Sequence, residues 1–263
     1  MAEFELLRWL SDRCSEYRLD VGGIFVRSGT HDWPITAANA QDLEAKLDSG
    51  GHLLALPKEP AALANILEVS LVDFIVVAAE SEEGLEARRG TERGYPDLEF
   101  SGPLLGGAFH AVDVKVARRA RSKRKTQSRI TLYTGNTYFK FPDLVWPGMF
   151  RPFSHYATHL DILIIYTLHP SIKGRVEDPE LIVHEAWRLG SRERSSTTRE
   201  YLGAVNDLDR LRNGTGDFDK PEDFYRYWRA YGFRLSKGVQ RQLDKLIREQ
   251  QAELVRLRGL QRS

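Results

Sequence analysis

The chain has 263 residues, 41% of them hydrophobic and 29% charged, which predicts one folded domain or one domain with an appendage and excludes two large domains. A net charge of +1 excludes a protein that attracts nucleic acid through its overall charge, so any phosphate affinity must come from how the charges are distributed. Cys14 is the single cysteine, which excludes an intrachain disulfide and a thiolate zinc site.

The sequence predicts neither a targeting signal nor a membrane span. No apolar run approaches the length needed to cross a bilayer, and the N-terminus lacks the pattern of a signal peptide. The lone cysteine fits a reducing compartment. We therefore expect a cytoplasmic protein with no membrane partner.

The first third of the chain predicts helices and one strand. Residues 3–17 carry apolar side chains at helical spacing, residues 20–27 predict a strand, and residues 41–47 predict a short helix. Pro60 begins a longer helix with a wide apolar stripe, since proline suits the first helical turn. Residues 80–94 are charged and predict a surface connection.

Glu68 lies on this apolar stripe, in line with Leu71 and Ile75. A carboxylate on the buried side of a helix needs a partner or a route to water. One interpretation is a residue at the edge of the stripe whose stem reaches solvent. The other is an acid that points at a metal site, and the helix alone does not choose between them.

Residues 95–116, YPDLEFSGPLLGGAFHAVDVKV, predict two short strands around a Gly/Pro-rich turn. Alternation places Asp97 and Glu99 on one face of the first strand, and Asp113 and Lys115 on one face of the second. Because unpaired buried ions are costly, these charges must neutralise one another or hold a cation. Carboxylates without Cys or His suit Mg²⁺, which usually acts on phosphate. We interpret Glu99 as a solvated strand residue.

Two arginine-rich segments are candidates for contact with nucleic acid. Residues 117–129 follow the predicted second strand directly and include Arg121, Lys123 and Arg124; such a run is usually a solvated face, but its position favours phosphate contacts. Residues 190–201, GSRERSSTTREY, predict a loop that is either an ordinary exposed connection or a base-contacting segment. From this loop we expect DNA contacts by Arg192, Arg194, Ser195, Ser196, Thr197, Thr198 and Arg199.

The remaining segments supply the core. Residues 130–141 predict a strand with a turn or a strand pair, and the apolar runs 161–168 and 181–189 are typical of the centre of a sheet. Helices are predicted at residues 221–231 and 236–260, the second with an apolar side that packs on this chain or on a partner.

A pair of histidines, His155 and His159, raises the question of a zinc site. The two would be ligands if they lay on a helix, but no third ligand of the usual type is evident. We interpret them as packing or hydrogen-bonding residues.

The spacing P-D, fifteen residues, D-V-K resembles the PD-(D/E)xK nuclease motif, in which both acids bind metal and the lysine assists the attacking water. The chain as a whole resembles a type II restriction endonuclease of the EcoRV kind. The segments that carry this likeness are collinear and span most of residues 17–232: DVGGI, LANILE, YPDLEF, AVDVKV, ITLYTGNT, SSTTRE and DKPEDFYRYWRAY.

The resemblance implies a mixed α/β fold of the PD-(D/E)xK restriction-endonuclease type, with a central mixed β-sheet flanked by helices. It implies Asp97 and Asp113 as metal ligands, Lys115 as the catalytic lysine and Glu68 as an additional acid from the helix. Val114 is counted with the expected metal-binding residues.

The resemblance also implies a homodimer on double-stranded DNA. Dimerisation is expected near residues 18–35, DNA contacts at residues 89–94 with Arg93 and at Thr131, and the major-groove loop at residues 194–199. Residues 1–234 would form a single catalytic and DNA-binding domain, followed by a helical extension at residues 235–263 that reaches beyond the resemblance.

The expected reaction is Mg²⁺-dependent hydrolysis of DNA phosphodiesters at a short palindrome, leaving blunt ends, with a DNA methyltransferase as functional partner. Mn²⁺ is expected to substitute, and Ca²⁺ to support binding without cleavage. Two alternatives stay open: a repair or mobile-element nuclease with the same motif, and a DNA-binding module that has kept the fold and lost the reaction. Intact Asp97, Asp113 and Lys115 argue against the second.

Overall fold

The computed structural model describes residues 4–19, 37–49, 59–91, 94–169, 171 and 175–260. The strand predicted at residues 20–27, nearly all of the dimerisation region and Arg93 therefore lie outside the described residues.

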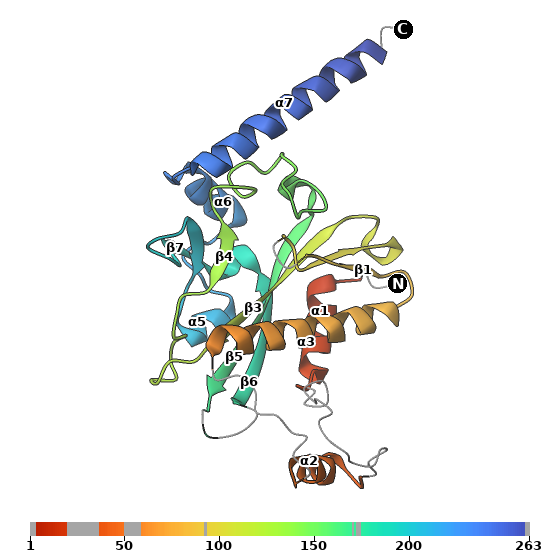
Figure 1. Ribbon diagram of the computed structural model, residues 1–263, viewed down its shortest axis with the longest axis vertical. Helices are drawn as coiled ribbons and strands as arrows, with labels where there is room; N and C mark the ends of the chain where they lie inside the picture. The colour runs from red at the N-terminus through yellow and green to blue at the C-terminus, as the bar shows by residue number, and fades with distance from the viewer. Residues whose placement is uncertain are drawn as a thin grey trace.

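A five-stranded mixed sheet forms the centre of the molecule (Figure 1). Its strands lie in the order β1 (Glu86–Arg89), β2 (Leu98–Ser101), β3 (His110–Arg118), β5 (Thr158–Leu168) and β6 (Val176–Glu185). β3 and β5 pair in parallel, and the other neighbouring strands pair antiparallel. Val- and Ile-rich stretches in β3 and β5 suit strands that are covered on both faces.

Two helices cover one face of this sheet. α3 (Pro60–Glu80) crosses β1 and β3, and α1 (Leu6–Glu16) packs on β6 (Figure 1). Proline stands in the first turn of α3, and the Glu59 side chain accepts a hydrogen bond from the backbone N–H of Ala62 at 2.6 Å. The core on this side contains leucines of α3 and even-numbered residues of β3 and β5: Leu63, Leu67, Leu71, Val112, Val114, Leu160, Ile162 and Ile164.

Helix α3 corrects one expectation. It has 21 residues and a window with mean hydropathy 2.0, so by length and composition it is apolar enough to cross a membrane. The expectation that no apolar run has this length was wrong. Here the helix buries one side against the sheet, with Leu63, Leu71 and Ile75 fully covered, while Val77 on the outer side is 63% exposed. A helix packed in this way serves as a layer of the domain.

The opposite face of the sheet carries a second layer of strands and short helices. A three-stranded sheet has the order β4 (Thr131–Thr134), β8 (Tyr201–Ala204) and β7 (Gly190–Arg194). α5 (Leu208–Asn213) and α6 (Pro221–Ala230) complete this layer. The core here is aromatic and includes Tyr95, Tyr133, Phe139, Phe153, Phe224 and Trp228. On β2, β3 and β5 the residues on this face are the odd-numbered ones, so the predicted active-site charges point toward this aromatic layer.

Most predicted elements are present, and three segments differ. The connection predicted at residues 80–94 contains β1, a strand recognised only through its pairing with β2. The loop predicted at residues 190–201 contains β7 and begins β8, so only residues 195–200 form a turn. The apolar run 181–189 leaves the sheet at Glu185 and ends in the helical turn α4 (Ala186–Leu189).

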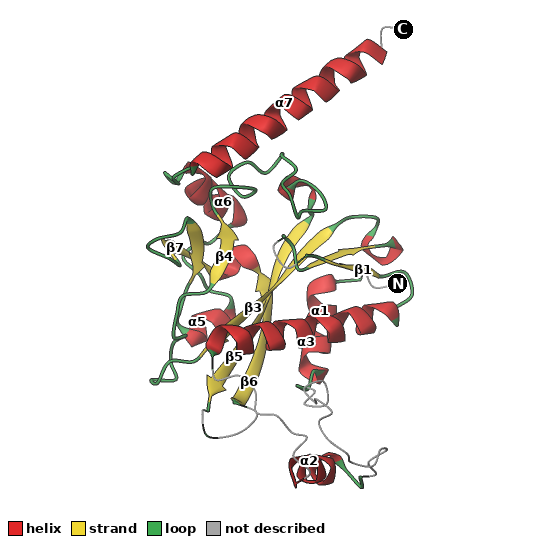
Figure 2. Cartoon of the chain, viewed as in Figure 1, coloured by secondary structure: helices red, strands yellow, loops and turns green. Residues whose placement is uncertain are grey.

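The predicted short helix and the C-terminal helix are confirmed as α2 (Ala40–Ser49) and α7 (Lys237–Leu260). α7 extends away from the two layers (Figure 2). Leu243 near its start is buried, whereas Leu254 and Val255 are 52% and 71% exposed. The apolar side of α7 therefore packs on the described part of the chain only at its N-terminal end.

Candidate active site

Strands β2 and β3 bring the predicted charges Asp97, Asp113 and Lys115 together. Leu98 pairs with Val112, and the same register sets Asp97 opposite Asp113. The Asp97 backbone N–H donates to Oδ1 of Asp113 at 3.3 Å, and the Lys115 ammonium forms an ion pair with Oδ2 of Asp113. Both carboxylates and the lysine thus share one side of the sheet.

The close approach of the backbone at residue 90 to residues 96 and 97 depends on a glycine. The Gly90 N–H donates to the Asp97 carbonyl at 2.7 Å. A Cβ at Gly90 would lie 2.0 Å from the Pro96 carbonyl oxygen, closer than any side chain permits. The backbone N–H of Val114 then donates to Oδ2 of Asp97 at 2.7 Å and holds that carboxylate over β3.

Charge and burial shift the acid–base properties of this group. Burial, and then the neighbouring Asp113 charge, raises the pKa of Asp97 to about 9. Burial lowers the pKa of Lys115, but the charges of Asp113, Asp97 and Asp161 outweigh it and leave that pKa raised. Lys115 is therefore held as an ammonium, and the two acids repel each other more than one lysine neutralises.

A pocket of about 260 Å³ opens onto this group. Asp97, Asp113 and Lys115 line it from the central sheet, and β4 contributes Thr131 and Tyr133. Four tyrosines line it, and one of them, Tyr138, stacks on Tyr95 with ring centroids 5.0 Å apart. The charged pair therefore lies in a recess with polar and aromatic walls.

The donor set fits a hard divalent cation bound through oxygen. With both carboxylates ionised, as ligands of a cation would be, the two acids and the Lys115 ammonium carry one net negative charge, −2 + 1, in a largely buried position. In the ranges described, no group of three or more acidic, His or Cys side chains is gathered closely enough to enclose a metal. Mg²⁺ suits such a site because it is usually held by one or two carboxylates and keeps several waters or phosphate oxygens.

A family model described as "Restriction endonuclease EcoRV" matches residues 30–250. The chain belongs to this family. A search of curated proteins found no match. The resemblance inferred from the motifs is thus confirmed, together with the mixed α/β fold, and the molecule is a nuclease that acts on DNA. Enzymes of this family generally depend on a divalent metal, in agreement with the donor set of the pocket.

The side chains of Glu68 and Val114, the two other predicted metal-binding residues of this endonuclease, do not lie in the pocket with Asp97 and Asp113. Glu68 lies half-buried on α3, which covers the opposite face of the sheet, and it does not line the pocket. Burial raises the pKa of Glu68, while the nearby charge of Lys115 opposes the rise. The side chain of Val114 is buried in the core beneath α3, so only its backbone reaches the site.

Glu99 is not the solvated residue that the sequence suggested. It is 3% exposed, and Arg151 donates to both of its carboxylate oxygens. Arg151 also lies over the Phe109 ring, with its guanidinium carbon 3.2 Å from the centroid. The expectation failed because the partner is 52 residues away in sequence.

His159 has the packing role that the sequence favoured. Its ring stacks on Phe153 at 3.8 Å, and Nδ1 is hydrogen-bonded to the Tyr95 hydroxyl at 2.7 Å. Burial lowers the pKa of His159 to about 3, so the ring is neutral. His155 belongs to a short 3₁₀ helix, Phe153–His155, and the described residues gather no His-based metal cluster around either ring.

The predicted base-contacting turn is attached to the rim of the pocket. The hydroxyls of Thr131 and Ser195 are 2.7 Å apart. Arg194 donates to Glu200 at 3.1 Å and to the Thr197 carbonyl at 3.3 Å, so it braces the turn from inside.

Three other residues of this turn are more accessible. Thr197, Thr198 and Arg199 are exposed, and Arg199 donates to the Tyr201 hydroxyl at 3.2 Å. The Ser196 hydroxyl accepts hydrogen bonds from the backbone N–H groups of Thr198 and Arg199 and so shapes the turn. Arg192, on β7, is exposed and lies over the rings of Phe218 and Tyr227.

The basic run after β3 lies at a different place from the acidic pocket. Arg121, Lys123 and Arg124 are exposed in a hairpin closed by the bridge between Arg119 and Thr126. A separate cavity of about 800 Å³ lies beside this hairpin. Arg119 is paired with Glu180 and Arg129 with Glu193, so two cations of the run are engaged within the chain.

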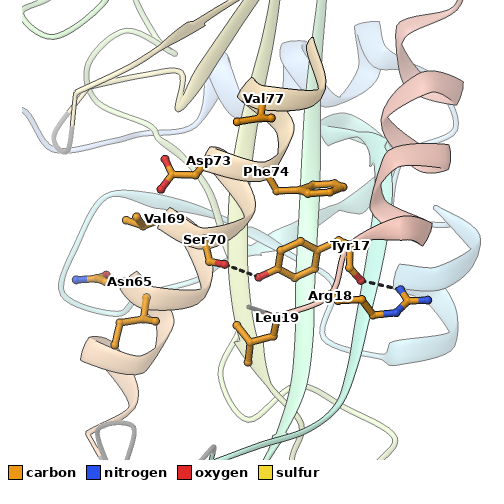
Figure 3. Close-up of a pocket in the computed structure, with 10 residues that line it drawn as sticks. Tyr17, Arg18, Leu19, Asn65, Val69, Ser70, Asp73, Phe74 and Val77 are labelled. Carbon is orange, nitrogen blue, oxygen red and sulfur yellow. Dashed lines mark hydrogen bonds between the residues drawn. The ribbon is translucent and has the colours of Figure 1, made fainter. Parts of the chain in front are cut away.

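A cavity of about 670 Å³ lies between the end of α1 and the outer side of α3 (Figure 3). Val69, Phe74 and Val77 make its wall largely apolar, and the Tyr17 hydroxyl donates to Oγ of Ser70 at 2.9 Å. It holds no arrangement of acids and a lysine like that on β2 and β3. We therefore do not assign hydrolysis to it.

Asp161 is an acid beside the site that the sequence pattern did not predict. Asp161 starts the apolar run of β5, and the parallel register sets it beside Asp113. It is 1% exposed. The available signal was a single carboxylate at the head of LDILII, a segment otherwise made for the centre of a sheet.

Proposed function

We propose that the chain is a type II restriction endonuclease that uses Mg²⁺ to hydrolyse both strands of DNA at a short palindrome, leaving blunt ends. The observation that carries the proposal is the pair Asp97 and Asp113 with Lys115 in one pocket, in a member of the EcoRV family. Residues 1–234 would act as one catalytic and DNA-binding domain of a homodimer, and residues 235–263 as its helical extension. A DNA methyltransferase would protect the host site.

Each predicted catalytic residue has a proposed role, including Glu68, which lies outside the pocket. Asp97 and Asp113 hold the metal through carboxylate oxygens, with Glu68 acting from α3 on a second ion or a water. The bound cation supplies a more acidic water and stabilises the negative charge of the transition state. Lys115, kept as an ammonium by the surrounding acids, orients or activates the attacking water.

The surrounding surface supports binding of a duplex. The hydrogen bond between Thr131 and Ser195 connects the pocket rim to the 195–200 turn, so the proposed base contacts are mechanically linked to the place of cleavage. Exposed Arg121, Lys123 and Arg124 would contact phosphates without distinguishing sequence.

The deciding experiment is cleavage of phage DNA by the purified full chain with Mg²⁺, with chelator in place of metal as control. Discrete fragments whose ends map to one palindrome support the proposal. A smear would instead indicate a nuclease without sequence preference, as expected for a repair or mobile-element enzyme. If a preparation that binds DNA in Ca²⁺ gives no cleavage product, the chain is a DNA-binding module that has lost the reaction.

A further inference from the structure

Asp161 is a buried acid without a hydrogen-bond partner at one of its oxygens. Its side chain is 1% exposed, and Oδ2 contacts no donor among the described residues. A carboxylate in such a position is costly, because burial removes the water that would solvate its charge. The presence of Asp161 at this position is explained if the side chain gains a partner in another state of the protein.

The parallel register identifies the candidate partner. Asp113 on β3 pairs with Asp161 on β5, and Lys115 pairs with Leu163, so all these side chains leave the same face of the sheet. Burial raises the pKa of Asp161 well above its usual range, and the charge of Lys115 opposes this rise. The charge of Asp161 in turn favours the ammonium form of Lys115. One lysine therefore interacts electrostatically with two acids on adjacent strands.

The ammonium of Lys115 is bound to Oδ2 of Asp113 in the present state. A divalent cation held by Asp113 would compete with Lys115 for that carboxylate charge. Without a second acceptor, Lys115 would then swing out of the pocket, where it is of no use to an attacking water.

We infer that Asp161 is a positioning residue that receives Lys115 when Asp113 takes up the metal. The inference rests on the proposed function, because it requires Asp113 to be a metal ligand. It explains why an acid without a partner is retained in the core. Asp161 acts through Lys115 and needs no contact with metal or DNA.

The test is a double-mutant cycle on Mn²⁺ affinity, measured without DNA from the paramagnetic resonance signal of the free ion. The full-length proteins are wild type, Asp161→Asn, Lys115→Met and the double variant. We expect Asp161→Asn to weaken Mn²⁺ binding by about fivefold or more with Lys115 present, and by less than about twofold in the Lys115→Met background, as coupled neighbours do. The reason is that Asp161 affects metal affinity only through Lys115, so removal of Lys115 removes the effect.

Other outcomes separate the alternatives. Equal weakening in both backgrounds would make Asp161 a direct influence on the metal and overturn the inference. A lower unfolding midpoint with unchanged Mn²⁺ affinity would make its role structural, which also overturns it. The same cycle with Asp161→Ala serves if the amide does not fold. If Asp113→Ala binds Mn²⁺ as wild type does, the metal-site assignment itself fails, an outcome distinct from the others.

Discussion

Arg151 holds Glu99 by two hydrogen bonds, from Nε to Oε2 at 2.6 Å and from Nη2 to Oε1 at 2.9 Å. Glu99 is buried two residues after Asp97, on the same side of β2 as the active-site pocket. Pairing with Arg151 neutralises this acid, so its charge is not added to those of Asp97 and Asp113. The Glu99–Arg151 ion pair therefore keeps a third uncompensated negative charge away from the proposed metal ligands.

Arg151→Met should destabilise the fold by about 3–5 kcal/mol, because it leaves the Glu99 carboxylate buried and unpaired. Urea unfolding of wild type and variant measures the difference. The control is the double variant Glu99→Gln, Arg151→Met, which should recover most of the loss, since no uncompensated charge remains. Equal destabilisation of the single and double variants would show that Arg151 stabilises by packing on Phe109 instead.

Asp113→Ala should reduce cleavage by about a hundredfold or more, because it removes a proposed metal ligand and the partner of Lys115. Lys115→Ala should be equally inactive but should still bind DNA in Ca²⁺, since the lysine serves the reaction. Asp209→Ala, at an exposed acid of α5, is the matched control and should cut as wild type does. An Asp113→Ala protein that cuts at a substantial fraction of the wild-type rate would contradict the site.

Metal-free stability should fall as pH rises, through the titration of Asp97. Its folded pKa of about 9 lies above the ordinary value of about 3.9, so between these limits the folded state binds more protons than the unfolded state. Asp97→Asn removes this effect. Its stability relative to wild type should therefore increase from about pH 5 to about pH 9 in chelator.

Mg²⁺ should reduce this advantage of Asp97→Asn, because the cation stabilises the ionised carboxylate of the wild type. Unfolding free energies of both proteins at each pH, with chelator and with Mg²⁺, make the comparison. A difference between the two proteins that does not vary with pH would mean that Asp97 is already ionised in the metal-free fold.

Neutralising Arg121, Lys123 and Arg124 together should weaken binding to all DNA sequences alike. The salt dependence of binding should flatten by about one unit of slope for each phosphate that the variant no longer neutralises. Fluorescence anisotropy at several salt concentrations measures the slope in Ca²⁺. The control removes the same number of cations in and just after α1, at Arg8, Arg13 and Arg18. An unchanged salt dependence for the hairpin variant would mean that this run is a solvated loop without phosphate contacts.

The two arginines of the 195–200 turn region should behave differently on substitution. Arg199 is exposed, so Arg199→Ala should cost roughly 1 to 3 kcal/mol on the cognate site and much less on random DNA, as removal of a guanine contact does. Arg194 braces the turn through Glu200, so Arg194→Ala should disturb the turn itself. Binding to cognate and random DNA in Ca²⁺ measures both. Equal losses of affinity on the two DNAs for Arg199→Ala would remove it from base recognition.

Sequencing of cut ends tests the target. A two-fold dimer presents one turn to each half-site, so a palindrome of about six base pairs with at least one G·C pair in each half is expected. An asymmetric site, or one made only of A·T pairs, would contradict the proposed arginine contacts with guanine.

The sequence by itself determined the elements whose signals are local. The alternation of residues 95–116 predicted β2 and β3, and their short connection placed Asp97 near Asp113 because the two strands are neighbours in the chain. The proline and apolar stripe predicted α3, and the collinear motifs identified the family. These inferences hold because a strand period, a helix period and a tight turn are properties of consecutive residues.

Only the tertiary structure decided which distant side chains meet. Glu99 is buried against Arg151, which lies 52 residues further along, and Asp161 came beside Asp113 through parallel pairing of β3 and β5. The edge strand β1 and the short strand β7 were likewise recognised only by their pairing with β2 and β8. Period and propensity do not encode which strands become neighbours, since that choice is made by burial of whole faces against one another.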